Sequence, residues 1–137
     1  MRDLRDFYDP HLHATINGAR FTVECPNAQD GFKLRAIMAD PQLAQGANEI
    51  TLINQLFKGD ELPEDPTQLP TGGLWDEMVA AGVTWPEMLH LGLTAIHYFG
   101  LGEEIALRYW ESADDKSGGE AAGKAVKPKT RRKKSNS

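Results

Sequence analysis

The sequence predicts a mainly α-helical α+β domain, in which an N-terminal β-hairpin packs on four to five short helices and a disordered basic tail follows. Two alternating apolar runs flank an Asn-Gly pair near the N-terminus, which is the strongest short-range signal for a hairpin. Apolar residues then recur at helical spacing, and large ones almost vanish beyond Ala113. We therefore divide the 137-residue chain into a domain over residues 1–113 and a tail over residues 114–137.

The hairpin is predicted over Leu12 to Val23, with Asn17-Gly18 as a two-residue type I′ turn. In this register one face is apolar and the other polar, which is the pattern of a half-buried sheet. The expected pairs are Leu12 with Val23, Ala14 with Phe21, and Ile16 with Ala19, and the polar face carries His13, Thr15, Arg20 and Thr22. Two strands alone are marginally stable in water, so the hairpin must pack on helices or pair with another chain.

Apolar spacing predicts helices over residues 28–39, 48–58, 74–82, 85–99 and 102–112. The clearest start is that of the fourth helix, because Thr84, Pro86 and Glu87 form a capping-box pattern with proline in the first turn. In the third helix the residues expected to face inward are Leu74, Trp75, Met78 and Val79. Three prolines and three glycines predict a loop between the second and third helices.

Charge is distributed unevenly along the chain. The formal net charge is −5, but residues 1–113 carry seventeen Asp/Glu against seven Lys/Arg, whereas residues 114–137 carry eight Lys/Arg against three acids. Only the basic tail therefore attracts phosphates. Its basic end comprises Lys127, Lys129, Arg131, Arg132, Lys133 and Lys134. These residues lack an aromatic neighbour that would stack on bases, and a solvated tail that aids solubility is the alternative to weak nucleic-acid binding.

Neither membrane insertion nor disulfide bonding is expected. No run approaches the roughly 20 apolar residues that span a bilayer. Charged residues occupy the N-terminus, where a signal peptide needs an apolar stretch, so we expect the protein to stay in the cytoplasm. Cys25 is the only cysteine, which excludes an intrachain disulfide and a thiolate metal cluster within one chain.

Few residues have the chemistry of a catalytic or metal site. One stripe of the fourth helix contains a Glu-x-x-His motif and comprises Glu87, His90, Thr94 and His97. Carboxylate-bridged metal sites need two such motifs, and the alternative is the polar face of an otherwise apolar helix. His11 and His13 are expected to be surface histidines rather than metal ligands. All serines lie at or beyond Ser112, so a hydrolytic triad is not expected, and the sequence predicts no enzyme, cofactor or metal.

Three segments of the sequence resemble a known family. Residues 3–10 read DLRDFYDP and precede the hairpin, residues 76–86 read DEMVAAGVTWP, and Ala106 to Tyr109-Trp110 come before the polar tail. Together these segments are similar to the tail assembly chaperones of actinobacterial siphophages and prophages. The motifs are structural, and no catalytic residue is implied.

The resemblance covers residues 3–25 and 74–110 and implies a role in the cytoplasm of the infected host. Such a chaperone binds the long tape measure protein, keeps it soluble, helps tail tube subunits polymerise around it, and is absent from the mature virion. Members are often made in two lengths by a programmed ribosomal frameshift. This chain looks like the shorter product, and Gly123-Lys124 is the candidate position of the shift.

A chaperone for apolar helices needs apolar surface of its own, and aromatic residues and Met are enriched at such surfaces. The candidate partner-binding residues are Trp75, Trp85, Met88, Phe99, Tyr109 and Trp110. The alternative is that they form the core. The hairpin edge and the strongly apolar fourth helix also favour a homo-oligomer. Two other functions fit the composition: a tail or head-completion protein of the virion, and a nucleic-acid-associated regulator that uses the basic tail.

Overall fold

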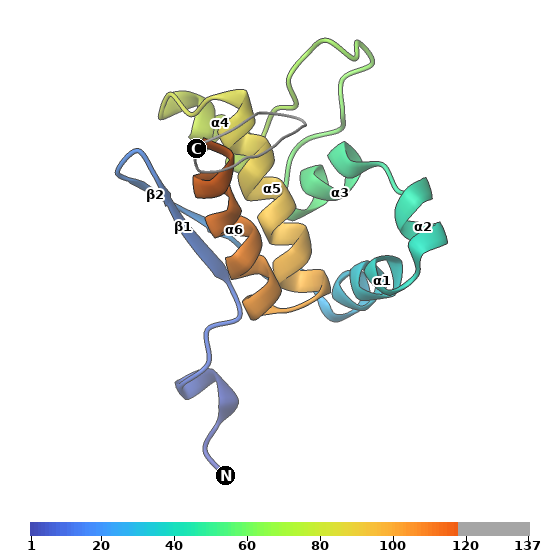
Figure 1. Ribbon diagram of the computed structural model, residues 1–137, viewed down its shortest axis with the longest axis vertical. Coiled ribbons are helices and arrows are strands. Elements are labelled where there is room, and N and C mark those ends of the chain that lie inside the picture. Colours follow the sequence, from blue (N-terminus) through green and yellow to red (C-terminus); the bar gives the residue numbers. More distant parts are fainter. Residues whose placement is uncertain (118–137) are drawn as a thin grey trace.

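The computed structural model describes residues 1–117 (Figure 1). Within these residues a short 3-10 turn precedes a two-stranded antiparallel hairpin, and six α-helices follow. The elements are η1 (Leu4–Asp6), β1 (Leu12–Ile16), β2 (Ala19–Val23), α1 (Ala28–Ala39), α2 (Pro41–Gly46), α3 (Glu49–Leu56), α4 (Gly73–Ala80), α5 (Trp85–Gly100) and α6 (Glu103–Ser117). The predicted fold class is confirmed, with one short helix more than expected. Of the predicted tail, residues 118–137 lie outside the described part of the chain.

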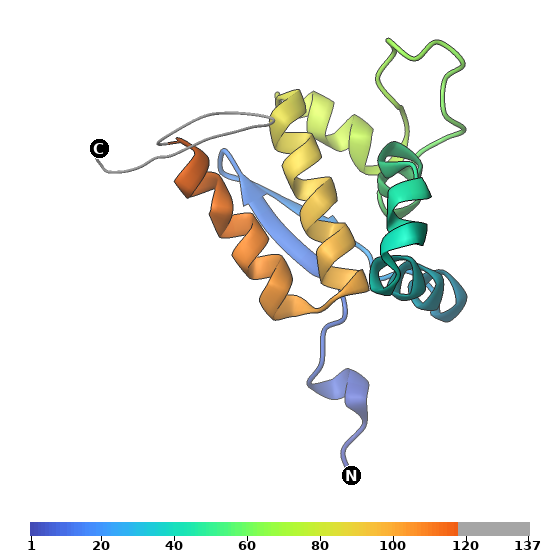
Figure 2. The same cartoon turned by 45° about the vertical axis from the view of Figure 1, so that its right-hand side comes forward.

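Helix α5 lies at the centre of the fold and contacts α1, α3, α6 and β1 (Figure 2). Helix α6 returns antiparallel beside it after a tight reversal at Gly102, whose φ of +128° favours glycine. On another side α5 approaches α3 closely, because Gly92 has no side chain and leaves room for Ile53. None of the helices described here is both long and apolar enough to cross a bilayer.

The predicted hairpin register is confirmed in every pair from Leu12↔Val23 to Ile16↔Ala19. Asn17 and Gly18 both have positive φ, at 51° and 82°, as a type I′ turn requires. The apolar face carries Ile16, Phe21 and Val23 into the core, whereas the polar face is exposed. The hairpin is thus stabilised by packing on α5 and α4.

Side-chain caps fix the three helices that follow the hairpin. Asn27 accepts the backbone N–H of Asp30 at the start of α1 (2.8 Å), and Asn48 accepts that of Thr51 at the start of α3 (3.1 Å). Helix α2 was not predicted. Asp40 ends α1 and also caps α2, and the proline that follows it suits the first turn of a helix.

Helix α4 presents a narrower buried face than expected. Leu74, Trp75 and Met78 are buried, but Val79 is exposed, so its predicted inward orientation is wrong. The helix has eight residues and buries one side only, and Val79 lies one position beyond Met78, outside that side. The predicted loop before α4 is confirmed, and its ends are joined by the hydrogen bonds Asp60 N–H to Thr71 C=O (2.8 Å) and Leu74 N–H to Phe57 C=O (2.9 Å).

Candidate functional site

The six predicted partner-binding residues separate into three groups. Trp75 and Met88 are buried in the core, so the core interpretation applies to them and neither is available to a partner in the folded chain. The indole N–H of Trp75 donates to the Asn54 amide oxygen (2.8 Å), and its ring meets Phe57 edge-on, with centroids 4.7 Å apart. A buried tryptophan whose N–H is already hydrogen-bonded stabilises the fold rather than a complex with a partner.

Phe99, Tyr109 and Trp110 form the second group and are half-buried, Phe99 on α5 and the other two on α6. The Tyr109 ring stacks on His90 (centroids 4.8 Å apart) and on His97 (4.7 Å). Burial raises the pKa of the Tyr109 phenol, and the negative charge of Glu49 adds to this effect. Tyr109, together with the Trp110 ring that lies 5.3 Å from His90, therefore joins α6 to α5.

Of the stripe of Glu87, His90, Thr94 and His97, Glu87 is exposed, the two histidines are half-buried and Thr94 is buried. Nε2 of His90 donates to the Trp110 carbonyl (3.0 Å) and Nδ1 of His97 to the Leu93 carbonyl (2.7 Å). A carbonyl only accepts, so these nitrogens carry the protons. The Thr94 hydroxyl is buried and donates to the carbonyl of His90 (2.7 Å). The Tyr109 ring of α6 stacks on both imidazoles, so this part of the stripe is covered by α6.

Trp85 forms the third group, because it is 42% exposed at the turn between α4 and α5. We use the name α4–α5 corner for the exposed residues of α4 and of the first turn of α5, namely Asp76, Glu77, Val79, Trp85 and Glu87. Gly82 shapes it with a φ of +76°, and Val79 is also exposed there. Trp85 is thus the predicted partner-binding residue that the structure places most openly on the surface.

The α4–α5 corner is acidic. Asp76, Glu77 and Glu87 are exposed, and the sequence has no Lys or Arg between Lys58 and Arg108. The capping box predicted for α5 is present: the Glu87 carboxylate accepts the Thr84 backbone N–H (2.8 Å) and the Thr84 hydroxyl (2.8 Å). These two hydrogen bonds, the backbone one first, lower the pKa of Glu87 below its usual range. The α4–α5 corner therefore exposes three carboxylates as well as Val79 and Trp85.

The histidines of the hairpin have protein partners. His13 lies between the Asp9 carboxylate (Nε2, 2.7 Å) and the Thr22 hydroxyl (Nδ1, 2.9 Å). Nδ1 of His11 accepts the backbone N–H of Cys25 (2.9 Å). Within residues 1–117 no three His, Cys, Asp or Glu residues are grouped in a way that could hold a metal ion.

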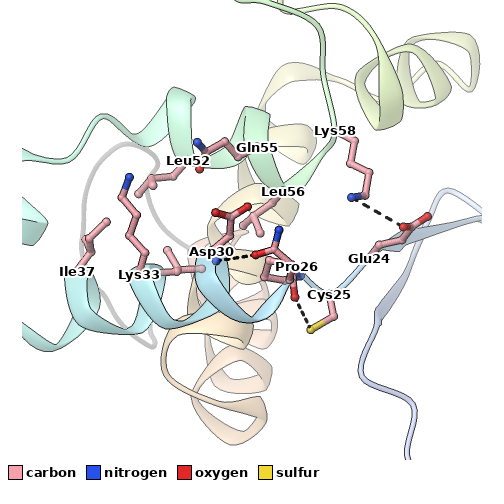
Figure 3. Close-up of a pocket in the computed structure, with 12 residues that line it drawn as sticks. Glu24, Cys25, Pro26, Asp30, Lys33, Ile37, Leu52, Gln55, Leu56 and Lys58 are labelled. Atoms are coloured by element: carbon pink, nitrogen blue, oxygen red, sulfur yellow. Dashed lines mark hydrogen bonds and ion pairs between the residues drawn. The ribbon is translucent and has the colours of Figure 1, made fainter. Parts of the chain in front are cut away.

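A groove of about 270 Å³ lies between α1 and α3, beside the end of β2 (Figure 3). Cys25 lies at its edge, and its thiol donates to the Pro26 carbonyl (3.4 Å) rather than to an imidazole. This contact does not pair the thiol with a general base, as a nucleophilic cysteine requires. Lys58 reaches toward Glu24 across the groove, with 4.0 Å between Nζ and Oε1. The rim of this groove therefore carries both a positive and a negative side chain.

A second groove, of about 490 Å³, lies between β1 and α6 with α5 beneath it, and we call it the α6–β1 groove. Its walls come from residues 11–15 and from the exposed side of α6, including Leu107. Trp110, one of the predicted residues, lines it as well. The other predicted site residues, Lys127 to Lys134 of the basic tail, lie outside the described part of the chain.

Comparison with known proteins places the chain in one family. A family model described as a domain of unknown function, DUF7426, matches residues 2–137. The chain belongs to the DUF7426 family. No curated protein and no solved structure matches it. The DUF7426 match includes both the folded body and the basic residues beyond it, so the family pattern does not end with the core.

Sequence reasoning missed one exposed apolar segment of this DUF7426 chain, in the residues before the hairpin. Leu4, Phe7 and Tyr8 are each more than half exposed. Their spacing of three and four residues was a signal for one helical turn with a shared face. It was overlooked because the intervening residues are charged and the segment is short.

Proposed function

We propose that this chain is a phage tail assembly chaperone that binds the tape measure protein, keeps it soluble and assists assembly of the tail tube. The proposal rests on the resemblance of residues 3–25 and 74–110 to that family, together with the exposure of Trp85. A tail or head-completion protein of the virion and a tail-dependent nucleic-acid regulator are the alternatives.

The exposed Trp85 is the observation that carries the proposal. Tryptophan is among the residues most enriched at binding hot spots, and a large aromatic ring left 42% exposed at a turn is costly unless something covers it. It lies within the segment 76–86 that carries the resemblance. Tape measure helices expose long apolar faces, and Trp85 with Val79 offers them an apolar contact.

The acidic side chains of the corner make this contact favour basic partners. Asp76, Glu77 and Glu87 are exposed on the same two helices as Val79 and Trp85, and they favour partner helices that carry Lys or Arg beside their apolar residues. Rim charges of this kind act mainly on the rate of association and on register rather than on affinity. The partner surface is therefore an amphipathic helix with basic flanks.

The proposal is tested by co-expressing the chain with the tape measure protein of the same phage or prophage. We expect the partner to be soluble and to co-purify only when the chain is present. Trp85→Ala should reduce co-purification by about tenfold or more, because loss of a hot-spot residue costs about 2 kcal/mol or more.

Phe32→Ala is the matched control, since Phe32 is an even more exposed aromatic residue on α1, away from the α4–α5 corner. Thermal unfolding of both variants shows whether each remains folded. If the tape measure protein is equally soluble with and without the chain, the chaperone function is wrong. If both variants bind equally, the α4–α5 corner is not the contact.

A further inference from the structure

The carboxylates of the α4–α5 corner lack a positive partner among the described residues. The ion pairs formed within residues 1–117 involve carboxylates other than those of Asp76, Glu77 and Glu87. The sequence has no Lys or Arg between Lys58 and Arg108 that could supply one locally. Neighbouring charges of one sign raise the local negative potential. A positively charged segment is therefore the chemistry that would stabilise this surface.

The chain itself contains such a segment beyond Ser117. Residues 1–117 carry nineteen Asp/Glu against eight Lys/Arg, whereas residues 118–137 carry seven Lys/Arg against one acid. All seven basic residues lie within residues 124–134, a stretch that contains no acid. The charge complementarity between this stretch and the α4–α5 corner therefore extends over its whole length.

Helix α6 ends at the same end of the molecule as the corner. It runs antiparallel to α5, and the hydrogen bond from Nε2 of His90 to the Trp110 carbonyl (3.0 Å) sets these two positions level with each other. At 1.5 Å per residue, Trp85 lies about 8 Å along α5 from His90, and Ser117 lies about 10 Å along α6 from Trp110 in the same direction. The end of α6 is therefore level with the start of α5 (Figure 2). Glu87 precedes His90 by one helical turn, so it lies on the side of α5 that faces α6.

The connection from α6 to the basic stretch is long enough to reach the corner of the same chain. Six residues separate Ser117 from residues 124–134. They span at most about 20–22 Å when extended, which exceeds the roughly 8–10 Å between the axes of packed helices. A connection this short gives an effective concentration near millimolar. The chain's own basic stretch therefore outcompetes that of a second copy present at micromolar concentration.

We propose that residues 124–134 occupy the α4–α5 corner of their own chain and compete with a partner for it. Their Lys and Arg side chains pair with the carboxylates of Asp76, Glu77 and Glu87, and an arginine lies on the exposed ring of Trp85. Surface charge pairs contribute little to stability, so the contact controls access to the corner rather than the fold. The competition rests on the proposed function, because the partner helices expected at the corner also carry Lys or Arg, whereas the contact itself does not depend on that function.

The loop before α4 is also acidic, but it is a poorer match for the basic stretch. Asp60 accepts the hydroxyl of Thr71 (3.2 Å) and Asp65 that of Thr67 (2.7 Å), so part of its charge is already engaged. Residues 59–73 include no aromatic ring on which an arginine could stack. The loop also extends away from the end of α6 in both views (Figures 1 and 2). The corner is therefore the favoured contact.

Carbodiimide cross-linking of the full-length chain tests the contact, because this reagent joins a lysine amine to a carboxylate that it touches. In a mixture of unlabelled and isotope-labelled chains, mass spectrometry distinguishes links within one chain from links between copies. We expect residues 124–134 to be joined to Asp76, Glu77 or Glu87 of the same chain. The yield should fall about tenfold at about 1 M salt, where charges are screened within about 3 Å. No such links, links mainly to the loop before α4, or links mainly between copies would each overturn the proposal.

Two matched variants separate the corner from acidic charge in general. Asp76→Asn/Glu77→Gln removes two exposed charges at the corner, and Glu103→Gln/Glu104→Gln removes two at the start of α6, at the opposite end of the helix pair. The first variant should lower the yield of links to Glu87 by about threefold or more, and the second should leave it unchanged. An equal fall in both variants would contradict a specific contact with the corner.

Partner binding provides the readout of competition. A full-length chain in which Arg131, Arg132, Lys133 and Lys134 are replaced by Ser should bind a basic amphipathic peptide of the tape measure protein about twofold or more tightly at low salt. The reason is that the corner is then free in a larger fraction of the molecules. Equal affinities of the two chains would show that competition is wrong. If neither chain binds the peptide or the whole tape measure protein, the proposed function fails, and the cross-links within one chain still decide whether the contact forms.

Discussion

At the scale of single residues, Asn54 connects two parts of the chain that lie far apart in sequence. Its amide oxygen accepts the indole N–H of the buried Trp75 (2.8 Å), and its amide nitrogen donates to the Asp60 carbonyl (2.9 Å). Asn54→Ala leaves the Trp75 N–H without its acceptor in the core, which costs about 1–3 kcal/mol. Urea unfolding should show a lower midpoint with an unchanged m-value.

Trp75→Phe is the matched background for this measurement, because it removes the indole N–H that Asn54 satisfies. In that background Asn54→Ala should lower the free energy of unfolding by clearly less. The difference between the two losses measures the coupling between Asn54 and Trp75. Equal costs in both backgrounds would show that the hydrogen bond does not carry the effect. Gly59 belongs to the same packing, since a Cβ there would collide with both Asn54 and Trp75.

At the scale of the elements, the start of α5 is fixed by its capping box, and this makes its stability depend on pH. Hydrogen bonds from Thr84 hold the pKa of Glu87 below its value in the unfolded chain. The charged carboxylate therefore stabilises the fold above about pH 4.3, and this contribution is lost as the pH falls through the lowered pKa. Glu87→Ala should lower the free energy of unfolding by about 0.3–1.5 kcal/mol at pH 7. When the pH is then lowered into the acid range, this variant should lose no further stability from position 87.

Glu87→Gln separates charge from hydrogen bonding in the capping box. The amide oxygen can still accept from Thr84, but the side chain no longer titrates. We expect thermal unfolding of this variant to lose part of the decline in stability between pH 5 and acid conditions. A Glu87→Gln variant whose stability falls with acid as steeply as that of the unchanged chain would refute the assignment.

The elements that the sequence predicted well have complete local signals. Asn17-Gly18 determined the hairpin register, and Thr84 with Glu87 determined the start of α5. Helix α2 was missed because one Asp-Pro pair both ends and begins a helix. Val79 was placed inward because an eight-residue helix shows too little periodicity to define its buried side.

The candidate site was less predictable than the elements, because it depends on which apolar residues the core leaves uncovered. The sequence marked Trp75 and Trp85 alike, yet one is enclosed by Asn54 and Phe57 and the other lies at a turn. The α6–β1 groove brings residues 11–15 together with residues 94–111. No local pattern predicts a contact across that separation.

At the scale of the whole molecule, the buried core lies well inside the chain. Its side chains run from Ile16 to Ala106, and Trp110 packs against them from the last helix. The sequence beyond Ser117 adds seven Lys/Arg and one acid to an acidic body. The core that the structure describes and the segment with a net positive charge therefore lie in different parts of the chain.

This separation predicts the result of shortening the chain. A protein that ends at Ser117 should unfold in urea with the same midpoint and m-value as the full chain, within about 0.5 kcal/mol, because it keeps every buried residue that the structure describes. A protein that ends at Gly102 loses α6, exposes Thr94 and the stacked His90 and His97, and should not fold cooperatively. Circular dichroism and urea titration of the two proteins measure this. A large loss of stability on removing residues 118–137 would mean that the basic segment packs on the acidic body and contributes to the fold, and the predicted boundary between domain and tail would then be wrong.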